Sequence, residues 1–433
     1  MNFITTVQYN GFIALSKGMT KKLQLTITSL APLGDGISIR DGQFHYVPGG
    51  IPGDIVEAEI IRKNKKETYT RLLRIVEPSS HRREASCPVF DKCGGCSLLM
   101  ADESLQRNTK EQTLARQFSF DRVTLVTAGP PLGYRRLARL HMRKTRNGNV
   151  QLGFFEKKAH RIADISRCPI LDNRISDILL PLKNGMLSGL DTATVRIASG
   201  NEGVFVQVET ESPPEPRFYE EAAKAVPGLL KGVVLNWNGI SSLIAGAATL
   251  TLSTAGGEAM QLPVGSFGQA NAHINEKLVA TASNWIRTSG EKRLLELYAG
   301  SGNFSCNLQH NLDHITLVEL DRDACEVAKL NFKNDKNINV ICDDALAAYR
   351  RVGLEAPVVL LDPPRTGAME LAMAMAEGHH KLIIYVSCNP ATLKRDLAYL
   401  HRGGYALREL VGFDMFPQTA HLEVAARLSK DEA

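Results

Sequence analysis

The sequence has no uninterrupted run of about 18 apolar residues, so no transmembrane helix is expected. Neither sign of charge dominates, because 51 Lys and Arg face 46 Asp and Glu and leave a formal net charge of +5. Apolar residues make up 44% of the 433 residues and charged residues 22%, which is ordinary for a globular protein. These values exclude a disordered, fibrous or membrane protein. At ~150 residues per domain, the length suggests about three domains.

The start of the sequence lacks the features of a secretory signal. Residues 1–17 carry a short apolar patch but no basic n-region and no long h-region, and Met19 is a second candidate start. Cysteine is also scarce, with eight in a long chain. Eight cysteines in a long chain without a secretory signal argue against a disulfide framework and favour metal-binding or catalytic thiols. We therefore expect a cytoplasmic protein.

Residues 21–77 have the pattern of a small β-barrel. Leu23, Leu25 and Ile27 alternate with polar residues, as in a half-buried strand, and glycine-rich turns separate further short strands. About five strands in some 55 residues are typical of an OB-like barrel. The end of this segment concentrates positive charge that is spread thinly elsewhere. Its basic residues are Arg62, Lys63, Lys65, Lys66, Arg71, Arg74, Arg82 and Arg83.

The middle region, 87–265, has a mixed α+β pattern, with a helix expected at 103–120. It contains a C-x5-C-x2-C group in which two glycines separate the last two cysteines, and a distant fourth cysteine. These residues are Cys87, Cys93, Cys96 and Cys168. Four thiolates suit either a structural zinc ion or an iron–sulfur cluster. Three other cysteines are interpreted as ordinary buried residues: Cys306, Cys325 and Cys342.

The last 165 residues alternate between apolar strands and helical patterns. Repeated strand–helix units predict a Rossmann-like, doubly wound parallel sheet with ligands at the carboxyl ends of its strands. The expected strands are 293–298, 315–320, 339–342, 358–361 and 381–387.

The first of these strands leads into a Gly-Ser-Gly turn at 300–302, where glycine lets the backbone approach a ligand. Glu319 ends the next strand, where a carboxylate would accept hydrogen bonds from ribose hydroxyls. Asp343 and Asp344 follow the third strand, where an acid can hold an adenine amino group. A third glycine and a Walker lysine are lacking, which disfavours pyrophosphate. A nucleoside without a phosphate fits S-adenosylmethionine (SAM).

The fourth strand ends in Asp-Pro-Pro-Arg at 362–365. An aromatic residue after the prolines would suggest methylation of an exocyclic amine, and Arg365 argues against that chemistry. The fifth strand ends at Cys388, followed by Asn389 as a predicted N-cap and by a proline suited to the first helical position. The positive end of the helix favours a thiolate, so Cys388 is a candidate nucleophile. The alternative is a buried structural cysteine.

A thiolate is what methylation at C5 of a pyrimidine requires. That carbon becomes nucleophilic only after a thiolate adds to C6, and the C5 proton must later be removed by a general base. Glu423, which leads into the final strand, is a candidate for this base. The alternative for Glu423 is an exposed acid at the edge of a strand.

These motifs together resemble the RNA uracil-5-methyltransferase family, most closely the 23S ribosomal RNA enzymes that carry a TRAM domain. The resemblance covers nearly the whole chain after about residue 20. Ser-Cys-Asn-Pro-Ala-Thr at 387–392 matches the nucleophile motif, and His-Leu-Glu at 421–423 matches the base motif. The resemblance implies that Cys388 and Glu423 are catalytic. It also implies a [4Fe–4S] cluster bound by Cys87, Cys93, Cys96 and Cys168.

The resemblance extends to the cofactor site and the domains. Phe-Gly-Gln-Ala-Asn at 267–271 matches the segment in which Gln269 would contact SAM and Phe267 would line the base pocket. The other implied SAM contacts are Tyr298, Asn303, Glu319, Asp344 (with Asp343 as its neighbouring alternative) and Asp362. The implied domains are a TRAM barrel at 20–78, a cluster-bearing central domain at 79–265 and a methyltransferase domain at 266–433.

The implied substrate is a uridine flipped out of 23S ribosomal RNA, and no obligate protein partner is expected. The basic residues of the barrel would contact phosphates without reading sequence, the alternative being a solvated run of charge. A runner-up within the family is the enzyme that methylates the T-loop uridine of transfer RNA. A radical SAM methylthiotransferase would need a C-x3-C-x2-C triplet, which this sequence lacks.

Overall fold

The computed structural model describes residues 21–430 except 227 and 255. The segment in which we expect no signal, including Met19, lies outside these residues. The chain divides into two compact units. The smaller contains the residues up to Ser86, Cys96–Thr113 and Gln418–Ala420, and the larger contains the rest. No helix in the described part of the chain has the length and apolar character needed to cross a membrane.

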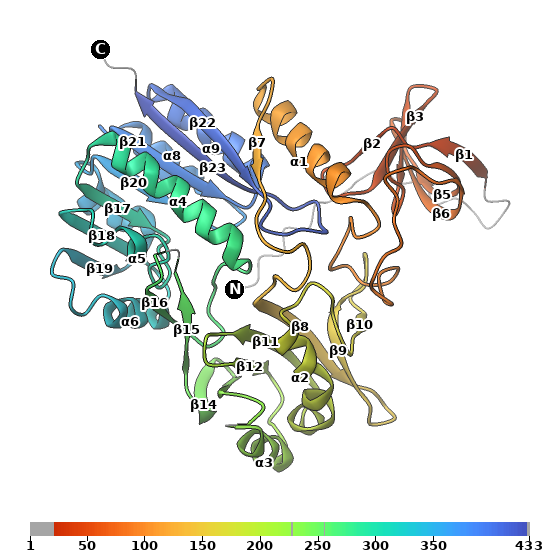
Figure 1. Cartoon of the computed structure of the whole chain (residues 1–433), viewed down its shortest axis with the longest axis horizontal. Coiled ribbons are helices and arrows are strands. Elements are labelled where there is room, and N and C mark those ends of the chain that lie inside the picture. The colour runs from red at the N-terminus through yellow and green to blue at the C-terminus, as the bar shows by residue number, and fades with distance from the viewer. Residues whose placement is uncertain (1–20, 227, 255, 431–433) are drawn as a thin grey trace. The chain divides into compact units, whose positions relative to one another are not determined.

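The smaller unit contains a six-stranded sheet, shown in red and orange in Figure 1. Its order is β1-β5-β6-β4-β3-β2. Only Ile27 and Thr28 separate β1 from β2, so the two ends of this order are adjacent in the chain and the sheet curls into a barrel. The strands are β1 Lys22–Thr26, β2 Ser29–Leu30, β3 Gly36–Arg40, β4 Gln43–Val47, β5 Ile55–Lys63 and β6 Glu67–Glu77.

Alternation places the apolar side chains inside this barrel, as the pattern of the first strand predicted. The enclosed core consists of Leu25, Ile27, Val47, Val56 and Ala58. The predicted helix is also present, as α1 Glu103–Phe118. Asp102 begins it, because its carboxylate accepts the backbone N–H of Leu105 at 2.8 Å and so satisfies a donor at the helix start.

The larger unit contains a seven-stranded sheet, in the order β10-β9-β8-β11-β12-β13-β14. Its pairs are antiparallel except β12 and β13, which the crossover helix α3 joins. The strands are β8 Leu137–Lys144, β9 Val150–Phe155, β10 Ile162–Asp164, β11 Thr192–Ser199, β12 Val204–Thr210, β13 Gly232–Trp237 and β14 Ile240–Gly246. The other elements are α2 Asn173–Asn184, η1 Met186–Gly189, α3 Pro216–Ala225 and the hairpin β15 Thr249–Ser253 and β16 Ala259–Pro263.

An eight-stranded sheet follows, in the order β19-β18-β17-β20-β21-β23-β22-β7. Its first five strands are parallel, but β23 runs antiparallel to both neighbours, so the sheet is mixed rather than fully parallel as expected. The strands are β7 Thr124–Val126, β17 Arg293–Leu297, β18 His314–Glu319, β19 Ile338–Cys342, β20 Val358–Leu361, β21 Leu382–Ser387, β22 Tyr405–Phe413 and β23 Glu423–Lys430. Strand β7 comes from the middle region, which its sequence did not indicate.

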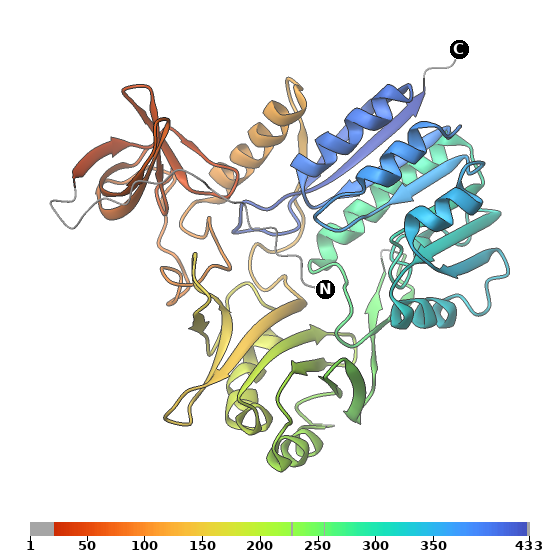
Figure 2. The same cartoon turned by 180° about the vertical axis from the view of Figure 1, so that it is seen from behind.

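Helices cover both faces of this sheet, which explains its nearly continuous apolar strands. Figure 1 shows α4 on one face, and Figure 2 shows α8 and α9 on the other. Successive residues therefore enter different cores: Leu294 belongs to the same core as Leu278 of α4, whereas Leu295 belongs to the core that contains Leu397 of α9. The helices are α4 Ala272–Ser289, α5 Ser305–Leu308, α6 Arg322–Asn331, α7 Ala345–Ala348, η2 Tyr349–Gly353, α8 Met369–Ala376 and α9 Pro390–Arg402.

Candidate active site

The sheet brings the predicted catalytic residues to one edge. Strand β20 ends just before Asp362 and β21 just before Cys388, so both residues lie at the carboxyl ends of parallel strands. Strand β23 runs in the opposite direction and begins at Glu423, with Ser387 paired to Val424. The start of an antiparallel strand lies at the edge where its parallel neighbours end. This reversal is what places a residue 35 positions after Cys388 beside it.

Cys388 is half-buried at the start of α9, as predicted. The Asn389 side chain accepts the backbone N–H of Ala391 at 3.1 Å and donates to the carbonyl of Arg365 at 3.0 Å. The thiol, however, is not held as a thiolate. Burial raises the pKa of Cys388 to about 11, and the carboxylates of Glu423 and Asp362 add to the shift while Arg365 opposes it. The predicted helix N-terminus is present beside the thiol, but burial and two nearby acids act on this pKa in the opposite direction.

The two carboxyl groups also have perturbed pKa values. Burial raises the pKa of Asp362 to about 7, while a hydrogen bond from Gln269 Nε2 at 3.2 Å acts against the rise. Glu423 is only 3% exposed, and its pKa is raised well above the usual range by burial and then by Asp362, with Arg365 again opposing. The Oε1 atom of Glu423 has no hydrogen-bond partner among the described residues. Glu423 is thus not the exposed strand-edge acid of the alternative interpretation.

These residues therefore form an acidic, largely buried cluster with the Arg365 guanidinium nearby. A thiol, two carboxyl groups and the Arg365 guanidinium influence one another electrostatically. Perturbed carboxyl pKa values from burial and a like charge are typical of catalytic sites. The Asp362 carboxyl group, with a pKa of about 7, can take up and release a proton near neutral pH.

The predicted SAM contacts lie along the same edge. Glu319 Oε2 accepts the backbone N–H of Gly300 at 2.8 Å, which ties the glycine turn to the end of β18. Tyr298 has a φ of 59°, and burial, followed by Asp344, raises its pKa to about 12. The Asn303 side chain exchanges two hydrogen bonds with Asn275, at 2.8 and 3.0 Å.

The two adjacent acids after β19 have different surroundings. Asp344 is exposed and caps α7, because its Oδ1 accepts the N–H groups of Leu346 and Ala347 at 3.0 Å each. Asp343 forms an ion pair with Arg351 at 2.9 Å. Phe267, expected to line the base pocket, is 80% exposed.

Glu296 is a buried acid that the sequence interpretation missed. It lies within β17, is 1% exposed and accepts a hydrogen bond from Ser305 Oγ. Burial raises its pKa to about 7, and Asp362 contributes to the rise. The sequence feature that could have revealed Glu296 is a single acidic residue within an apolar strand that leads into the glycine turn expected to bind a ligand.

Three of the four cysteines predicted to bind a cluster belong to the larger unit. In the larger unit, Cys93 is buried and its Sγ accepts the N–H of Gly95 at 3.4 Å. Burial raises the pKa of Cys168 to about 11, with contributions from Cys87 and Cys93, so these three thiols lie near one another. Cys96 belongs to the smaller unit. Four thiols have the right donor chemistry, but the part of the chain described here contains no group of three or more His, Cys, Asp or Glu side chains in metal-binding geometry.

All eight cysteines are free thiols. Cys306 and Cys325 are buried as predicted. The same prediction for Cys342 is wrong, because this residue is exposed at the end of β19. Strand β19 is at the edge of the sheet, where side chains lack a neighbouring strand on one side.

Half of the basic residues near the barrel have acidic partners that local sequence did not reveal. Strand β5 lies antiparallel to β6 and places Glu57 against Arg74, at 2.8 Å, and Glu59 against Arg71. Arg82 forms two hydrogen bonds with Asp54, whose side chain is fully buried.

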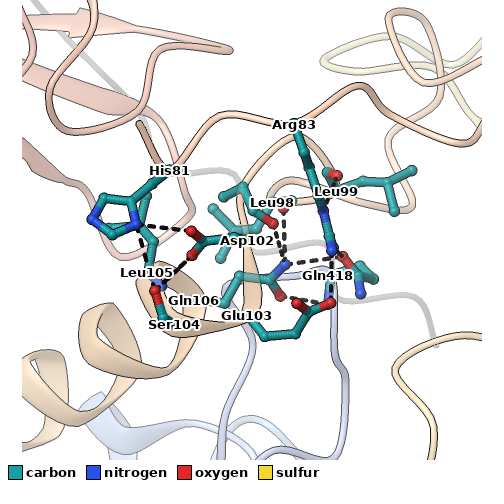
Figure 3. A network of polar contacts seen from close by, with 11 residues as sticks. His81, Arg83, Leu98, Leu99, Asp102, Glu103, Ser104, Leu105, Gln106 and Gln418 are labelled. Carbon is teal, nitrogen blue, oxygen red and sulfur yellow. Dashed lines mark hydrogen bonds and ion pairs between the residues drawn. The ribbon is translucent and has the colours of Figure 1, made fainter. Parts of the chain in front are cut away.

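Arg83 is also engaged within the smaller unit. It donates to the carbonyl of Leu99, to Glu103 and to Gln418 (Figure 3). The lysines of the β5–β6 turn, in contrast, are exposed: Lys63, Lys65 and Lys66.

Comparison with known proteins identifies the family. The family model of tRNA (Uracil-5-)-methyltransferase matches residues 251–431. The 23S rRNA (uracil(1939)-C(5))-methyltransferase RlmD of Pseudomonas putida is 33% identical over 94% of this chain and 93% of its own length. The chain belongs to the RNA uracil-5-methyltransferase family. The RlmD of Pseudomonas fluorescens is a further relative, 32% identical over 94% of this chain and 91% of its own.

A solved structure has the same fold. The Pyrococcus abyssi tRNA (uracil-54, C5)-methyltransferase in complex with S-adenosyl-L-homocysteine matches with a TM-score of 0.76. The match covers 94% of this chain and 100% of that one at 23% identity. Membership of the RNA uracil-5-methyltransferase family confirms the resemblance that the motifs indicated.

Proposed function

We propose that the protein transfers a methyl group from SAM to C5 of a uridine in 23S ribosomal RNA. The observation that carries this proposal is the meeting of Cys388 and Glu423 at the ligand edge of the eight-stranded sheet. Support for the ribosomal substrate comes from the relatives named RlmD, which match over nearly their whole length.

In the proposed reaction, the Cys388 sulfur adds to C6 of the flipped uracil and electron density moves to C5. SAM would supply the methyl group to C5 and leave as S-adenosylhomocysteine, and until that transfer its sulfonium would bring a positive charge to the site. C5 then bears both the methyl group and its original proton. Glu423 takes that proton, the C5–C6 double bond re-forms and the bond from sulfur to C6 breaks.

This reaction requires proton transfers, and the groups with perturbed pKa values can perform them. The Cys388 thiol must lose its proton before it attacks, and Asp362, with a pKa of about 7, is a nearby carboxylate that can hold it. Glu423 must be ionised when the C5 proton is removed. A cation lowers the pKa values of acids around it, so the bound methyl donor favours the Cys388 thiolate before the methyl group is transferred.

We assign SAM binding to residues along the strand ends. In this assignment Glu319 contacts the ribose and Asp344 contacts the adenine. The other proposed contacts are Gln269, Tyr298, Asn303 and Asp362. The Gln269→Leu substitution would remove both the proposed cofactor contact and the hydrogen bond to Asp362. The SAM affinity of this variant should therefore fall, as measured by calorimetry.

We assign a [4Fe–4S] cluster to Cys87, Cys93, Cys96 and Cys168. The nearness of three of these thiols and their glycine neighbours supports the assignment, and zinc is the alternative. Iron and sulfide analysis of anaerobically purified protein tests it, together with absorbance at roughly 400 nm, where thiolate–iron bands lie. Zinc without sulfide would contradict it.

We further propose that the barrel is a TRAM domain that binds RNA phosphates. The three exposed lysines of the β5–β6 turn carry this role, since Arg82 and Arg83 are engaged within the protein. The corresponding domains are 20–78, 79–265 and 266–433. The partner is RNA, without an obligate protein partner, in the cytoplasm.

A covalent trap tests the reaction. Changing Glu423 to Gln should let methyl transfer proceed but block proton removal, so a methylated RNA–protein adduct should accumulate on a denaturing gel. The Cys388→Ala variant is the control and should form no adduct. Normal turnover of the Glu423→Gln variant would contradict the assignment of the base.

A second candidate is methylation of the T-loop uridine of transfer RNA. The description of the matching family model and the archaeal relative of the same fold favour it. Mass mapping of 5-methyluridine in 23S and transfer RNA from a deletion strain distinguishes the two substrates.

A further inference from the structure

Two cysteines that the proposed reaction does not use meet where β18 and β19 end. Cys325 lies in α6, is fully buried and donates from Sγ to the carbonyl of Glu319 at 3.2 Å. Cys342 is the last residue of β19 and pairs with Glu319 across the two strands. Both cysteines therefore lie beside the residue to which we assign the ribose of SAM.

The direction of the side chains brings the two thiols together. Helix α6 contacts both β18 and β19 (Figure 1). Val340 and Cys342 are two positions apart in β19 and so share a face of the sheet, and Val340 packs against the core that contains Phe332, the residue after α6. The Cys342 and Cys325 thiols are hydrogen-bonded to each other, and Lys329 of α6 interacts electrostatically with both.

The two thiols differ in access and in acidity. Cys342 is exposed, because β19 is at the edge of the sheet, so a reagent in solution can reach it. Burial raises the pKa of Cys325 to about 12, and the neighbouring Cys342 thiol adds to the rise. Cys325 should therefore stay protonated until Cys342 has been modified. An accessible thiol beside a second thiol that can resolve it is typical of redox-sensitive sites.

We infer that Cys325 and Cys342 form an oxidation site, and that a disulfide between them lowers the affinity for SAM; this inference rests on the proposed function. The oxidant is a small-molecule disulfide such as oxidised glutathione. The Cys342 thiolate attacks one of its sulfurs, so that a mixed disulfide forms and one glutathione leaves. Cys325 then attacks the Cys342 sulfur, and its proton passes to the second departing glutathione. The protein loses two hydrogen atoms, and the oxidant is reduced to two thiols.

The disulfide should displace the proposed SAM contacts. A sulfur–sulfur bond is about 2 Å long, shorter than a hydrogen bond between thiols, so the two sulfurs must approach each other. Cys325 is in a packed helix, whereas Cys342 ends an edge strand and should move, together with Asp343 and Asp344 after it. The movement would strain the 2.9 Å bond from the Asp343 N–H to the Glu319 carbonyl, and that carbonyl would lose its Cys325 donor. The proposed ribose and adenine contacts would then no longer fit one nucleoside together.

The catalytic residues should stay in place. In the order of the sheet, β17 and β20 separate β18 from β21, the strand that ends before Cys388. The chemical steps should therefore be unaffected once SAM is bound. KM for SAM should rise while kcat stays nearly constant, a split that a general loss of structure would not produce.

The experiment compares the full-length wild-type protein with Cys342→Ser, Cys325→Ser and Cys306→Ser. Cys306 is the matched control, a buried thiol whose pKa is raised by burial and nearby acids rather than by another thiol. Each protein is equilibrated anaerobically with a series of ratios of oxidised to reduced glutathione and then freed of glutathione. Peptide mapping quantifies the disulfide, calorimetry gives the SAM affinity, and methylation of a 23S ribosomal RNA transcript gives kcat and KM.

Oxidation should link Cys325 to Cys342 in the wild type and in Cys306→Ser. The SAM affinity should fall ~10-fold or more, the loss expected when one hydrogen bond to a charged group is broken, and a reductant should restore it. Cys342→Ser should keep its affinity at every ratio. Cys325→Ser should stop at a mixed disulfide between Cys342 and glutathione. Cys342→Ser keeps the experiment decisive if Cys325→Ser does not fold, because the side chain that it replaces is exposed.

Absence of a disulfide between Cys325 and Cys342 at the most oxidising ratio would overturn the inference. So would a disulfide that leaves the SAM affinity unchanged, or a kcat that falls as far as the affinity does. Failure of the proposed function has a different signature. In that case the reduced wild-type protein would bind no SAM, which would overturn both proposals.

Discussion

Alkylation of Cys388 measures how strongly the site opposes formation of the thiolate. Burial, Glu423 and Asp362 raise the pKa of this thiol from 9.0 to about 11. The difference corresponds to ~2.7 kcal/mol and to a roughly 100-fold smaller thiolate fraction below pH 9. At pH 8 the thiolate fraction should be ~0.1%, against ~10% for an unperturbed thiol. Since only the thiolate reacts, iodoacetamide should label Cys388 about 100-fold more slowly than such a thiol.

Two substitutions test the electrostatic part of this account in opposite directions. Asp362 has a pKa of about 7 and is therefore anionic at pH 8 to 9. Replacing it with Asn removes the charge but keeps an acceptor for Gln269, so the Cys388 pKa should fall and labelling should accelerate. Replacing Arg365 with Met removes a cation that favours the thiolate, so labelling should slow.

The assay is peptide mapping of iodoacetamide-labelled protein between pH 7 and 10. The exposed Cys342 in each sample serves as the internal reference. The rate of Cys388 labelling should rise about tenfold per pH unit over this range, without reaching a plateau. A plateau below pH 9 would refute the reasoning, as would an unchanged rate in Asp362→Asn or faster labelling in Arg365→Met.

Three further outcomes follow from the perturbed and paired charges. Turnover should rise with pH across neutrality, because Cys388 and Glu423 must both be ionised and both have raised pKa values; a profile that falls from pH 6 to 8 would contradict this. Arg82→Ala should cost ~3 kcal/mol in urea unfolding, because it leaves the buried Asp54 carboxylate without its ion pair.

Although burial acts to raise the Asp54 pKa, Arg82 and two backbone N–H groups hold it below its usual value. The loss should therefore be full at pH 7 and shrink as the pH falls through that pKa, and a pH-independent loss would contradict the pairing. Finally, replacing the three exposed lysines of the β5–β6 turn with Ala should weaken RNA binding. The slope of the logarithm of the binding constant against the logarithm of the salt concentration should become shallower by at most about three. An unchanged slope in filter binding would exclude these lysines from phosphate contact.

Local sequence determined much of the site. Apolar segments that alternate with helical patterns predicted the strands that end near Glu319, Asp362 and Cys388, because burial on both faces requires unbroken apolar runs. Asn389 and the following proline predicted the start of α9, because capping depends on adjacent residues alone. The motifs that carried the resemblance were likewise contiguous in the chain.

Only the tertiary structure decided which charges meet. Glu57 and Glu59 form ion pairs with arginines on the next strand, and Asp54 forms one with Arg82. None of these acids is adjacent to its partner in the sequence. The raised pKa of Cys388 likewise comes from burial and from acids on other strands, which outweigh the helix end that sequence reasoning considered. The hydrogen bond from Gln106 to Gln418 joins residues 312 positions apart. Sequence determines a residue's own strand, cap or turn, whereas its dielectric surroundings and distant partners exist only once the chain has folded.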